Sequence, residues 1–203
     1  VLFRSDKGAS IVEQNDLYDL HIKNLADDKF FKELSDKLNP INLNVFRKAY
    51  KRLLEKFNFN FLEMSQFGGL SLNKNLNILI NNPSASFIDK VSNNIKKYLD
   101  FNTISINFDK NDFQKSIEEL NQKLDNAQEF FEKTGKYSII ELEGFDELLC
   151  DTTQENKNLI EKFSNMMRDI NTKHHAIAIL KTQRPQEQLS INAINEQRFL
   201  IRF

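Results

Sequence analysis

Four short apolar runs, separated by long segments of helical periodicity, constrain the fold of this chain more than any other feature. The runs lie at 75–80, 103–106, 138–142 and 176–180. Each has the length of a strand, and the apolar residues within 75–80, 138–142 and 176–180 suit strands that are covered on both faces. Because the intervening segments are long enough to form crossover helices, the pattern predicts an α/β fold with a parallel sheet sandwiched by helices. A shorter run at 200–203 is predicted to close the sheet.

The segments between the runs have recognisable helix signals. Ser84 or Ser86 is placed to cap a helix that ends near Leu99, and longer helices are predicted at 109–133 and 154–170. The buried centre of the sheet is predicted to contain Leu79, Ile80, Ile139, Ile140, Leu142, Ile177 and Ile179.

The N-terminal part has a different pattern of apolar residues. Residues 1–10 show no periodicity, whereas helical spacing of apolar residues predicts helices at 17–38 and 44–58. The second helix is predicted to bury one face, formed by Val45, Phe46, Ala49, Leu53, Leu54 and Phe57. Gly68-Gly69 then marks a turn. We therefore predict an N-terminal linker and helical extension over 1–65, followed by the α/β domain over 66–203.

Charge and cysteine content exclude several classes of protein. The chain has 28 Lys and Arg against 29 Asp and Glu, so no basic excess favours a nucleic-acid partner or an anionic membrane surface. The lone Cys150 excludes an internal disulfide and a multi-cysteine zinc site, and it fits a reducing compartment such as the cytoplasm or an organelle stroma or matrix. No apolar run approaches the roughly 18 residues that a membrane helix needs, and no signal peptide is visible.

Other conspicuous residues are explained more simply by packing than by chemistry. His174 and His175 are adjacent, so on a strand they would face opposite ways and could not share a metal. The Phe30-Phe31, Phe130-Phe131 and Met166-Met167 pairs are predicted to pack in the core. No metal and no cofactor is predicted.

Three segments together resemble a known family. They are 77–88 (NILINNPSASFI), 138–148 (SIIELEGFDEL) and 176–185 (AIAILKTQRP). In order, they are similar to a strand with its phosphate loop, a strand ending in Asp-Glu, and a strand ending in Thr-Asn-Arg-Pro. This order resembles the large subdomain of AAA+ ATPases, most closely the FtsH-like branch, and the resemblance covers 76–203.

The same resemblance implies a nucleotide site that has lost its phosphate-binding groups. A phosphate loop needs glycines whose backbone N–H groups wrap the phosphates, a Lys for their charge, and a hydroxyl for Mg²⁺. Here Phe87 stands at the Lys position and Ile88 at the hydroxyl position, and we expect Phe87 to fill the site. The glycine positions, and the proline within the loop, are Asn81, Ser84, Ser86 and Pro83.

The catalytic positions of the family have changed as well. Glu143 stands at the metal-supporting Asp, Gly144 replaces the Glu that polarises the attacking water, and Gln183 replaces the polar sensor Asn. Loss of both the Lys and the base removes the charge stabilisation and the water positioning that phosphoryl transfer needs. No enzymatic activity is therefore expected.

Two further positions bear on a role in a ring of subunits. Arg198-Phe199 resembles the family's arginine finger, which reaches the γ-phosphate of the neighbouring subunit, although a surface Arg is the simpler reading. An aromatic-Gly pore loop is missing from 108–120, which contains Phe113 but no glycine. Substrate threading by this subunit is therefore not expected.

The resemblance implies a catalytically inactive FtsH-like subunit with a structural or regulatory role in a hetero-oligomeric ring. Its partners would be homologous active AAA+ subunits that act on proteins by unfolding, proteolysis or import. The family's helical lid would follow Phe203, so the lid is either lost or outside this chain. A membrane anchor outside the chain would place the complex at a membrane face.

Three alternatives stay open at this point. A clamp-loader-type pseudo-ATPase would be expected to carry a zinc module, which the single cysteine disfavours. A purely helical interaction module would require every strand prediction to be wrong. A divergent ATPase that is still active would show measurable turnover.

Overall fold

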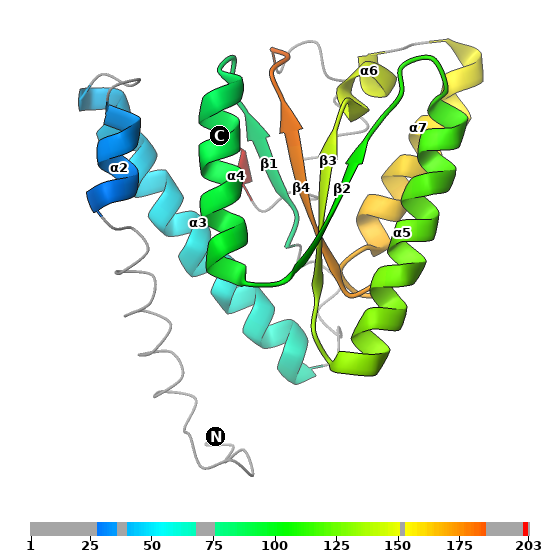
Figure 1. Ribbon diagram of the computed structural model, residues 1–203, viewed down its shortest axis with the longest axis horizontal. Helices are drawn as coiled ribbons and strands as arrows, with labels where there is room; N and C mark the ends of the chain where they lie inside the picture. Colours follow the sequence, from blue (N-terminus) through cyan, green and yellow to red (C-terminus); the bar gives the residue numbers. More distant parts are fainter. Residues whose placement is uncertain (1–27, 36–39, 68–75, 151–152, 186–200, 203) are drawn as a thin grey trace. The chain divides into compact units, whose positions relative to one another are not determined.

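The computed structural model describes residues 28–35, 40–67, 76–150, 153–185 and 201–202 (Figure 1). By its contacts the chain divides into two compact units, residues 1–62 and residues 63–203, which we describe separately. The predicted linker at 1–10 and the predicted turn at Gly68-Gly69 lie outside the described residues.

The second unit is built on a parallel sheet, as predicted. The strands are β1 (Ile78–Asn81), β2 (Asn102–Asn107), β3 (Ser138–Glu143), β4 (Ala176–Thr182) and β5 (Ile201–Arg202). They lie in the order β2-β3-β4-β1-β5, and every neighbouring pair is parallel. The sheet confirms the α/β fold class and rules out the purely helical alternative.

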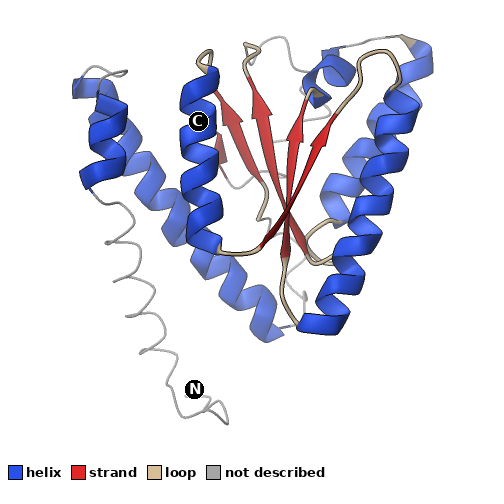
Figure 2. Cartoon of the chain, viewed as in Figure 1, coloured by secondary structure: helices blue, strands red, loops and turns tan. Residues whose placement is uncertain are grey.

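Helices cover the two faces of this sheet (Figure 2). One face carries α4 (Ala85–Leu99), and the other carries α5 (Phe113–Thr134), α6 (Phe145–Cys150) and α7 (Gln154–Asp169). Alternate residues of each strand point to opposite faces, so Leu79, Ile140 and Leu180 join the core beneath α5, α6 and α7. All seven residues predicted for the buried centre are at most 1% exposed.

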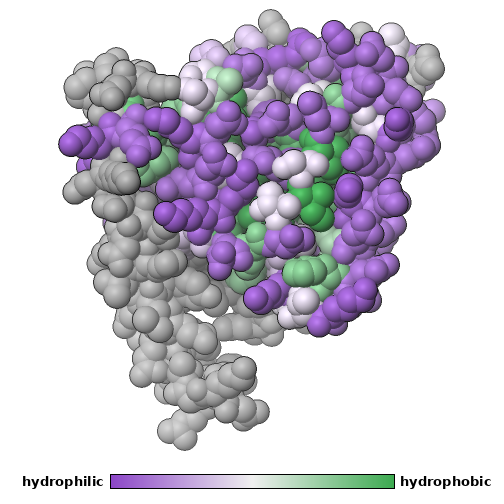
Figure 3. Space-filling view, viewed as in Figure 1, coloured by the Kyte–Doolittle hydropathy of each residue, from purple (hydrophilic) through white to green (hydrophobic). Residues whose placement is uncertain are grey.

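The outer surface seen in Figure 3 is largely polar. On that face, the most strongly apolar area lies between α4 and α5, over the edge strand β2. The burial pattern of β2 agrees, because Ile106 is buried while Thr103 and Ser105 are exposed. No helix of the described residues is both long and apolar enough to cross a membrane.

Local signals fix the ends of α4 and α5. Ser84 caps α4, since its Oγ accepts a hydrogen bond from the Phe87 amide at 3.4 Å. The α5 helix begins four residues later than predicted, because Asp109 forms a turn with Asp112, and Asp112 then caps the helix. Gly135, in a left-handed conformation with φ 68°, ends α5.

The first unit contains α2 (Asp28–Ser35) and most of α3 (Pro40–Phe67). The rest of the helix predicted at 17–38 lies outside the described residues, and α3 extends beyond both predicted ends. The prediction that Val45 is buried is wrong, because its relative exposure is 64%. The rest of the predicted face is buried at Phe46, Leu53, Leu54 and Phe57, and Ala49 is half-buried. Phe46 also packs in an aromatic cluster with Phe30, Phe31 and Tyr50.

Two predictions about paired residues need correction. His174 and His175 do not lie on a strand but in the turn that precedes β4. Phe130 and Phe131 are only half-buried, and Phe131 stacks on His175 instead of entering the main core. Phe30 and Phe31 are buried, as predicted.

We predict that Ile140→Ala lowers the free energy of unfolding by about 2–5 kcal/mol, because it opens a cavity in a fully buried central strand. Thr103→Ala, at an exposed position on the neighbouring strand, is the matched control and should cost less than about 1 kcal/mol. Urea unfolding of both variants gives the comparison. Similar costs for the two substitutions would mean that β3 is not the centre of the core.

Candidate functional site

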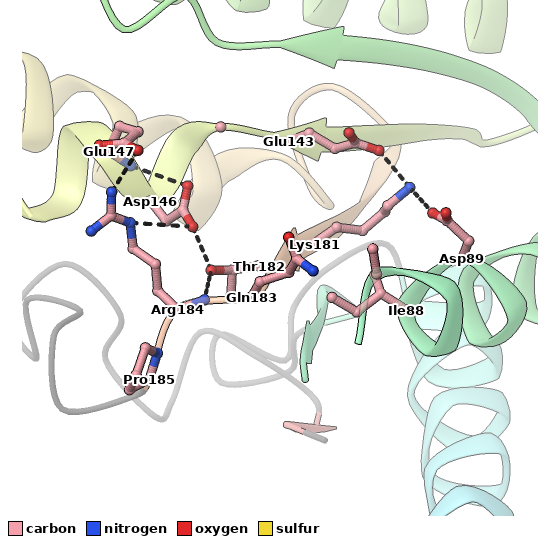
Figure 4. A pocket seen from close by; sticks show the side chains of 12 residues that line it. Ile88, Asp89, Glu143, Asp146, Glu147, Lys181, Thr182, Gln183, Arg184 and Pro185 are labelled. Carbon is pink, nitrogen blue, oxygen red and sulfur yellow. Dashed lines mark hydrogen bonds and ion pairs between the residues drawn. The ribbon is translucent and has the colours of Figure 1, made fainter. Parts of the chain in front are cut away.

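A pocket of about 520 Å³ lies at the carboxyl ends of the central strands (Figure 4). From β1 the chain crosses to the far edge at β2 and then returns through β3 and β4 to pair with β1 again. Open α/β sheets bind ligands at such a reversal, outside the carboxyl ends of the strands. The pocket is lined by Ala85, Ile88, Asp89, Glu143, Gly144, Asp146, Glu147, Lys181, Thr182, Gln183, Arg184 and Pro185.

Lys181, near the end of β4, forms the central ion pairs of this site. Its Nζ lies 2.7 Å from Asp89 Oδ1 of α4 and 2.5 Å from Glu143 Oε1 of β3. Only 12% of the Lys181 side chain is exposed. Burial alone would lower the pKa of Lys181, but hydrogen bonds with Asp89 and Glu143 and the charge of Glu141 raise it well above its ordinary value. The ammonium is therefore permanently charged and already paired.

Glu141 extends this network beneath α4. It lies in the middle of β3 and is 5% exposed, and its carboxylate accepts hydrogen bonds from Ser92 at 2.6 Å, Lys96 at 2.9 Å and Ser105 at 3.2 Å. Burial raises the pKa of Glu141, but these bonds and the charge of Lys181 outweigh burial and lower the pKa to about 2.

A second set of contacts ties the start of α6 to the end of β4. Thr182 Oγ1 donates to Asp146 Oδ2 at 2.6 Å, and the Arg184 amide donates to Thr182 Oγ1 at 3.1 Å. The Arg184 guanidinium contacts Glu147 Oε1 at 2.5 Å and lies 3.7 Å from Asp146 Oδ2. Figure 4 shows this cluster on the opposite side of the pocket from Lys181.

The charge balance of the lining is acidic. Two cations, Lys181 and Arg184, face four carboxylates, those of Asp89, Glu143, Asp146 and Glu147. Each cation is paired with carboxylates from the same lining. No three His, Cys, Asp or Glu side chains among the described residues are arranged to hold a metal ion. A phosphate group in this pocket would therefore be repelled by the carboxylates and would find both cations of the lining already paired.

The segment 81–84, which runs from the end of β1 to the start of α4, is held by other parts of the chain. Asn81 Nδ2 donates to the Arg184 carbonyl at 3.0 Å, and the Asn82 amide donates to the Thr182 carbonyl at 3.1 Å. The Ser84 amide donates to Asn82 Oδ1 at 2.9 Å. From β4, Gln183 Nε2 donates to the Pro83 carbonyl at 3.1 Å. Polar groups of this segment are therefore used to join the ends of β1 and β4.

Several of the residues predicted for this site lie there, but one prediction needs correction. Ile88, Glu143, Gly144 and Gln183 line the pocket. Phe87 is buried but does not line it, so Ile88 and not Phe87 supplies the apolar wall of the pocket. Ser86 is exposed at the start of α4, and Arg198 lies outside the described residues.

Gly144 has a backbone reason to be glycine. Its φ is +71°, and a Cβ at this position would lie 2.8 Å from the Phe108 carbonyl oxygen and 3.0 Å from Asn107 Oδ1. The close approach arises because the Phe108 amide donates to the Glu143 carbonyl at 2.9 Å, just before the chain turns into α6. A side chain long enough to act as a base cannot be placed here without moving the backbone.

Sequence reasoning missed the residues that dominate the site: Asp89, Glu141, Asp146, Lys181, Thr182 and Arg184. A usable signal was present for two of them. Glu141 and Lys181 interrupt or directly follow apolar runs, where an ionised side chain must find a partner. Their pairing depends on the register of β3 and β4, which places Glu141 opposite Ile179. The α6 helix was missed because its six residues are too few to show periodicity.

Gly144→Ala is predicted to destabilise the fold more than Gly135→Ala. Both glycines have positive φ, but a Cβ at Gly135 meets nothing within 4 Å. Left-handed strain alone should therefore cost about 1 kcal/mol at Gly135, whereas the clash with the Phe108 carbonyl should add roughly 1–2 kcal/mol at Gly144. Urea unfolding measures the difference, and equal costs would contradict the close backbone contact.

No protein-family model matches the chain, and no curated protein is similar to it in sequence.

Proposed function

We propose that this chain is a catalytically inactive AAA+-like subunit with a structural or regulatory role in a hetero-oligomeric ATPase ring that acts on proteins. One observation carries the inactive part of the proposal. The two cations that line the pocket, Lys181 and Arg184, are both bound by carboxylates of the same pocket.

The charge requirement of phosphoryl transfer explains why this observation matters. Catalysis of that reaction depends on cations and backbone donors aimed at the transferring phosphoryl group, together with a residue that positions the nucleophile. Here the lining has twice as many carboxylates as cations. Gly144 leaves no base at the end of β3, and Phe87 and Ile88 provide neither a cation nor a metal ligand at the start of α4.

The same contacts support a structural role. In this chain Asp89 of α4, Glu143 of β3 and Lys181 of β4 are joined directly, without a ligand between them. A site held together in this way keeps one arrangement of α4 and the central strands through any nucleotide cycle of its neighbours. Such rigidity suits a subunit that completes a ring or passes force between active members.

The choice of partner rests on the resemblance of three segments, 77–88, 138–148 and 176–185, to the FtsH-like branch of AAA+ ATPases. The structure supports this choice to the extent that the three segments meet at one edge of the sheet and line one pocket. Homologous active subunits are therefore the proposed partners, in a protease or import-motor context.

The protein is predicted not to bind Mg-ATP at millimolar nucleotide, as measured by isothermal titration calorimetry. A double variant, Glu143→Gln with Glu147→Gln, serves as the comparison because it removes one carboxylate from each of Lys181 and Arg184. If paired charges block the site, the variant should bind inorganic phosphate more tightly than the unaltered chain does. Micromolar Mg-ATP binding by the unaltered protein would overturn the proposal and favour a divergent active ATPase.

Arg198 provides the test of ring membership. In the complex isolated from its source, homologous ATPase subunits should co-purify, and Arg198→Ala should lower the ATPase rate of that complex. The substitution should leave the unfolding midpoint of the isolated chain unchanged. This result would distinguish an arginine that acts on the neighbouring subunit from one that stabilises this chain. If the ATPase rate of the complex is unchanged by the substitution, this subunit only completes the ring and does not contribute to catalysis. A complex without ATPase subunits would refute the ring.

A further inference from the structure

Buried polar atoms without a partner gather at the end of the sheet opposite the pocket. Among the described residues, three buried side-chain atoms lack a hydrogen-bond partner: Ser138 Oγ, His174 Nδ1 and His175 Nδ1. Ser138 begins β3, and the two histidines lie in the segment 170–175 that joins α7 to β4, which we name the α7–β4 turn. Native proteins leave few such atoms unpaired, so this concentration calls for an explanation.

His174 is buried against α5. Its side chain is 6% exposed, and its imidazole also hydrogen-bonds the backbone of Leu124. Nδ1 lies 3.9 Å from Asp125 Oδ1, which is too far for a hydrogen bond. The Asp125 side chain is 59% exposed, so water screens its charge. This environment favours the neutral imidazole of His174 over the charged one.

His175 joins the same turn to the end of α5. Its ring stacks on Phe131 with centroids 3.7 Å apart and an interplanar angle of 6°, and its φ is +50°. Its carbonyl accepts a hydrogen bond from the Ser138 amide at 3.2 Å, so the residue also fixes the start of β3. A positive φ is unfavourable for a residue other than glycine, so the surrounding contacts must stabilise this backbone conformation of His175.

Protonation acts against this packing. Burial lowers the pKa of His174, the charge of Lys173 lowers it further, and Asp125, the backbone of Leu124 and Asp169 oppose the shift without cancelling it. Burial likewise lowers the pKa of His175 below its ordinary value, against the opposing charge of Glu132 and a hydrogen bond with the backbone of Lys173.

We propose that the α7–β4 turn is an acid-sensitive latch, held against α5 while His174 and His175 are neutral and opened locally when they are protonated. The proposal is independent of the ring function. Because the folded state favours the neutral rings, their contribution is complete above the unfolded pKa of about 6.5 and is lost as the pH falls below it. Glu141 acts in a different window: its pKa of about 2 means that its contribution is lost only below about pH 4.5.

Hydrogen exchange followed by mass spectrometry tests the latch between pH 7.5 and pH 5.5, where Glu141 stays ionised. After correction for intrinsic rates, opening of the turn and of the facing part of α5 should increase by up to about tenfold per histidine for each pH unit below 6.5. The pocket end of the sheet should change less. His174→Gln or His175→Gln should weaken this dependence, and the double variant should abolish it. His21→Gln, which removes a histidine elsewhere, is the matched control and should behave as the unaltered chain.

Proton NMR titration of the unaltered protein provides a second readout that does not depend on a variant folding. Ring-proton shifts of His174 and His175 should titrate below pH 6.5. Titration of His174 at or above pH 6.5 would overturn the latch. Hydrogen exchange in the α7–β4 turn of the unaltered chain that does not change with pH, after correction for intrinsic rates, would also overturn it. A double variant that keeps the full pH dependence would overturn it equally.

Discussion

The ion pairs of Lys181 are the interaction on which the pocket end of this fold depends. The Lys181 side chain is 12% exposed, and its ammonium contacts Asp89 of α4 and both Glu141 and Glu143 of β3. Helix α4 connects β1 to the distant edge strand β2. The Lys181 contacts join this helix to β3 and β4, two central strands that do not adjoin it in sequence. Lys96 and Ser92 of α4 reinforce the attachment through Glu141.

Such a network stabilises one arrangement more than it stabilises folding as a whole. The side chains of Lys181 and Glu141 are largely buried, whereas those of Asp89 and Glu143 are partly exposed. A buried ion pair loses hydration that its attraction only partly restores, yet removal of one buried member leaves an unpaired charge that is far more costly. In this pocket the members come from three separate elements. The requirement that all of them stay paired therefore restricts how α4, β3 and β4 can move relative to one another. This restriction is the physical basis of the structural role that we propose.

The sheet was predictable because its information is local. Apolar runs over β1, β3 and β4 are buried on both faces, and the pattern that indicates such strands is formed by residues that lie next to one another in sequence. The candidate site was predictable in part because the resemblance of three segments pointed to Ile88, Glu143, Gly144 and Gln183, and the carboxyl ends of the central strands bring these residues to one pocket. The aromatic face of α3 was harder, since helical spacing alone did not show that Val45 lies just outside it.

The sequence by itself determined which segments form strands and helices and that the sheet is parallel. Only the tertiary structure decided which side chains pair at the pocket, because ion pairs form between residues that are distant in sequence, such as Asp89 and Lys181. It also showed why Gly144 is glycine, since the carbonyl of Phe108 approaches it from another strand end. Spacing along a chain reports which face a residue occupies, whereas charge pairing depends on strand order and register, which arise only when the sheet is assembled.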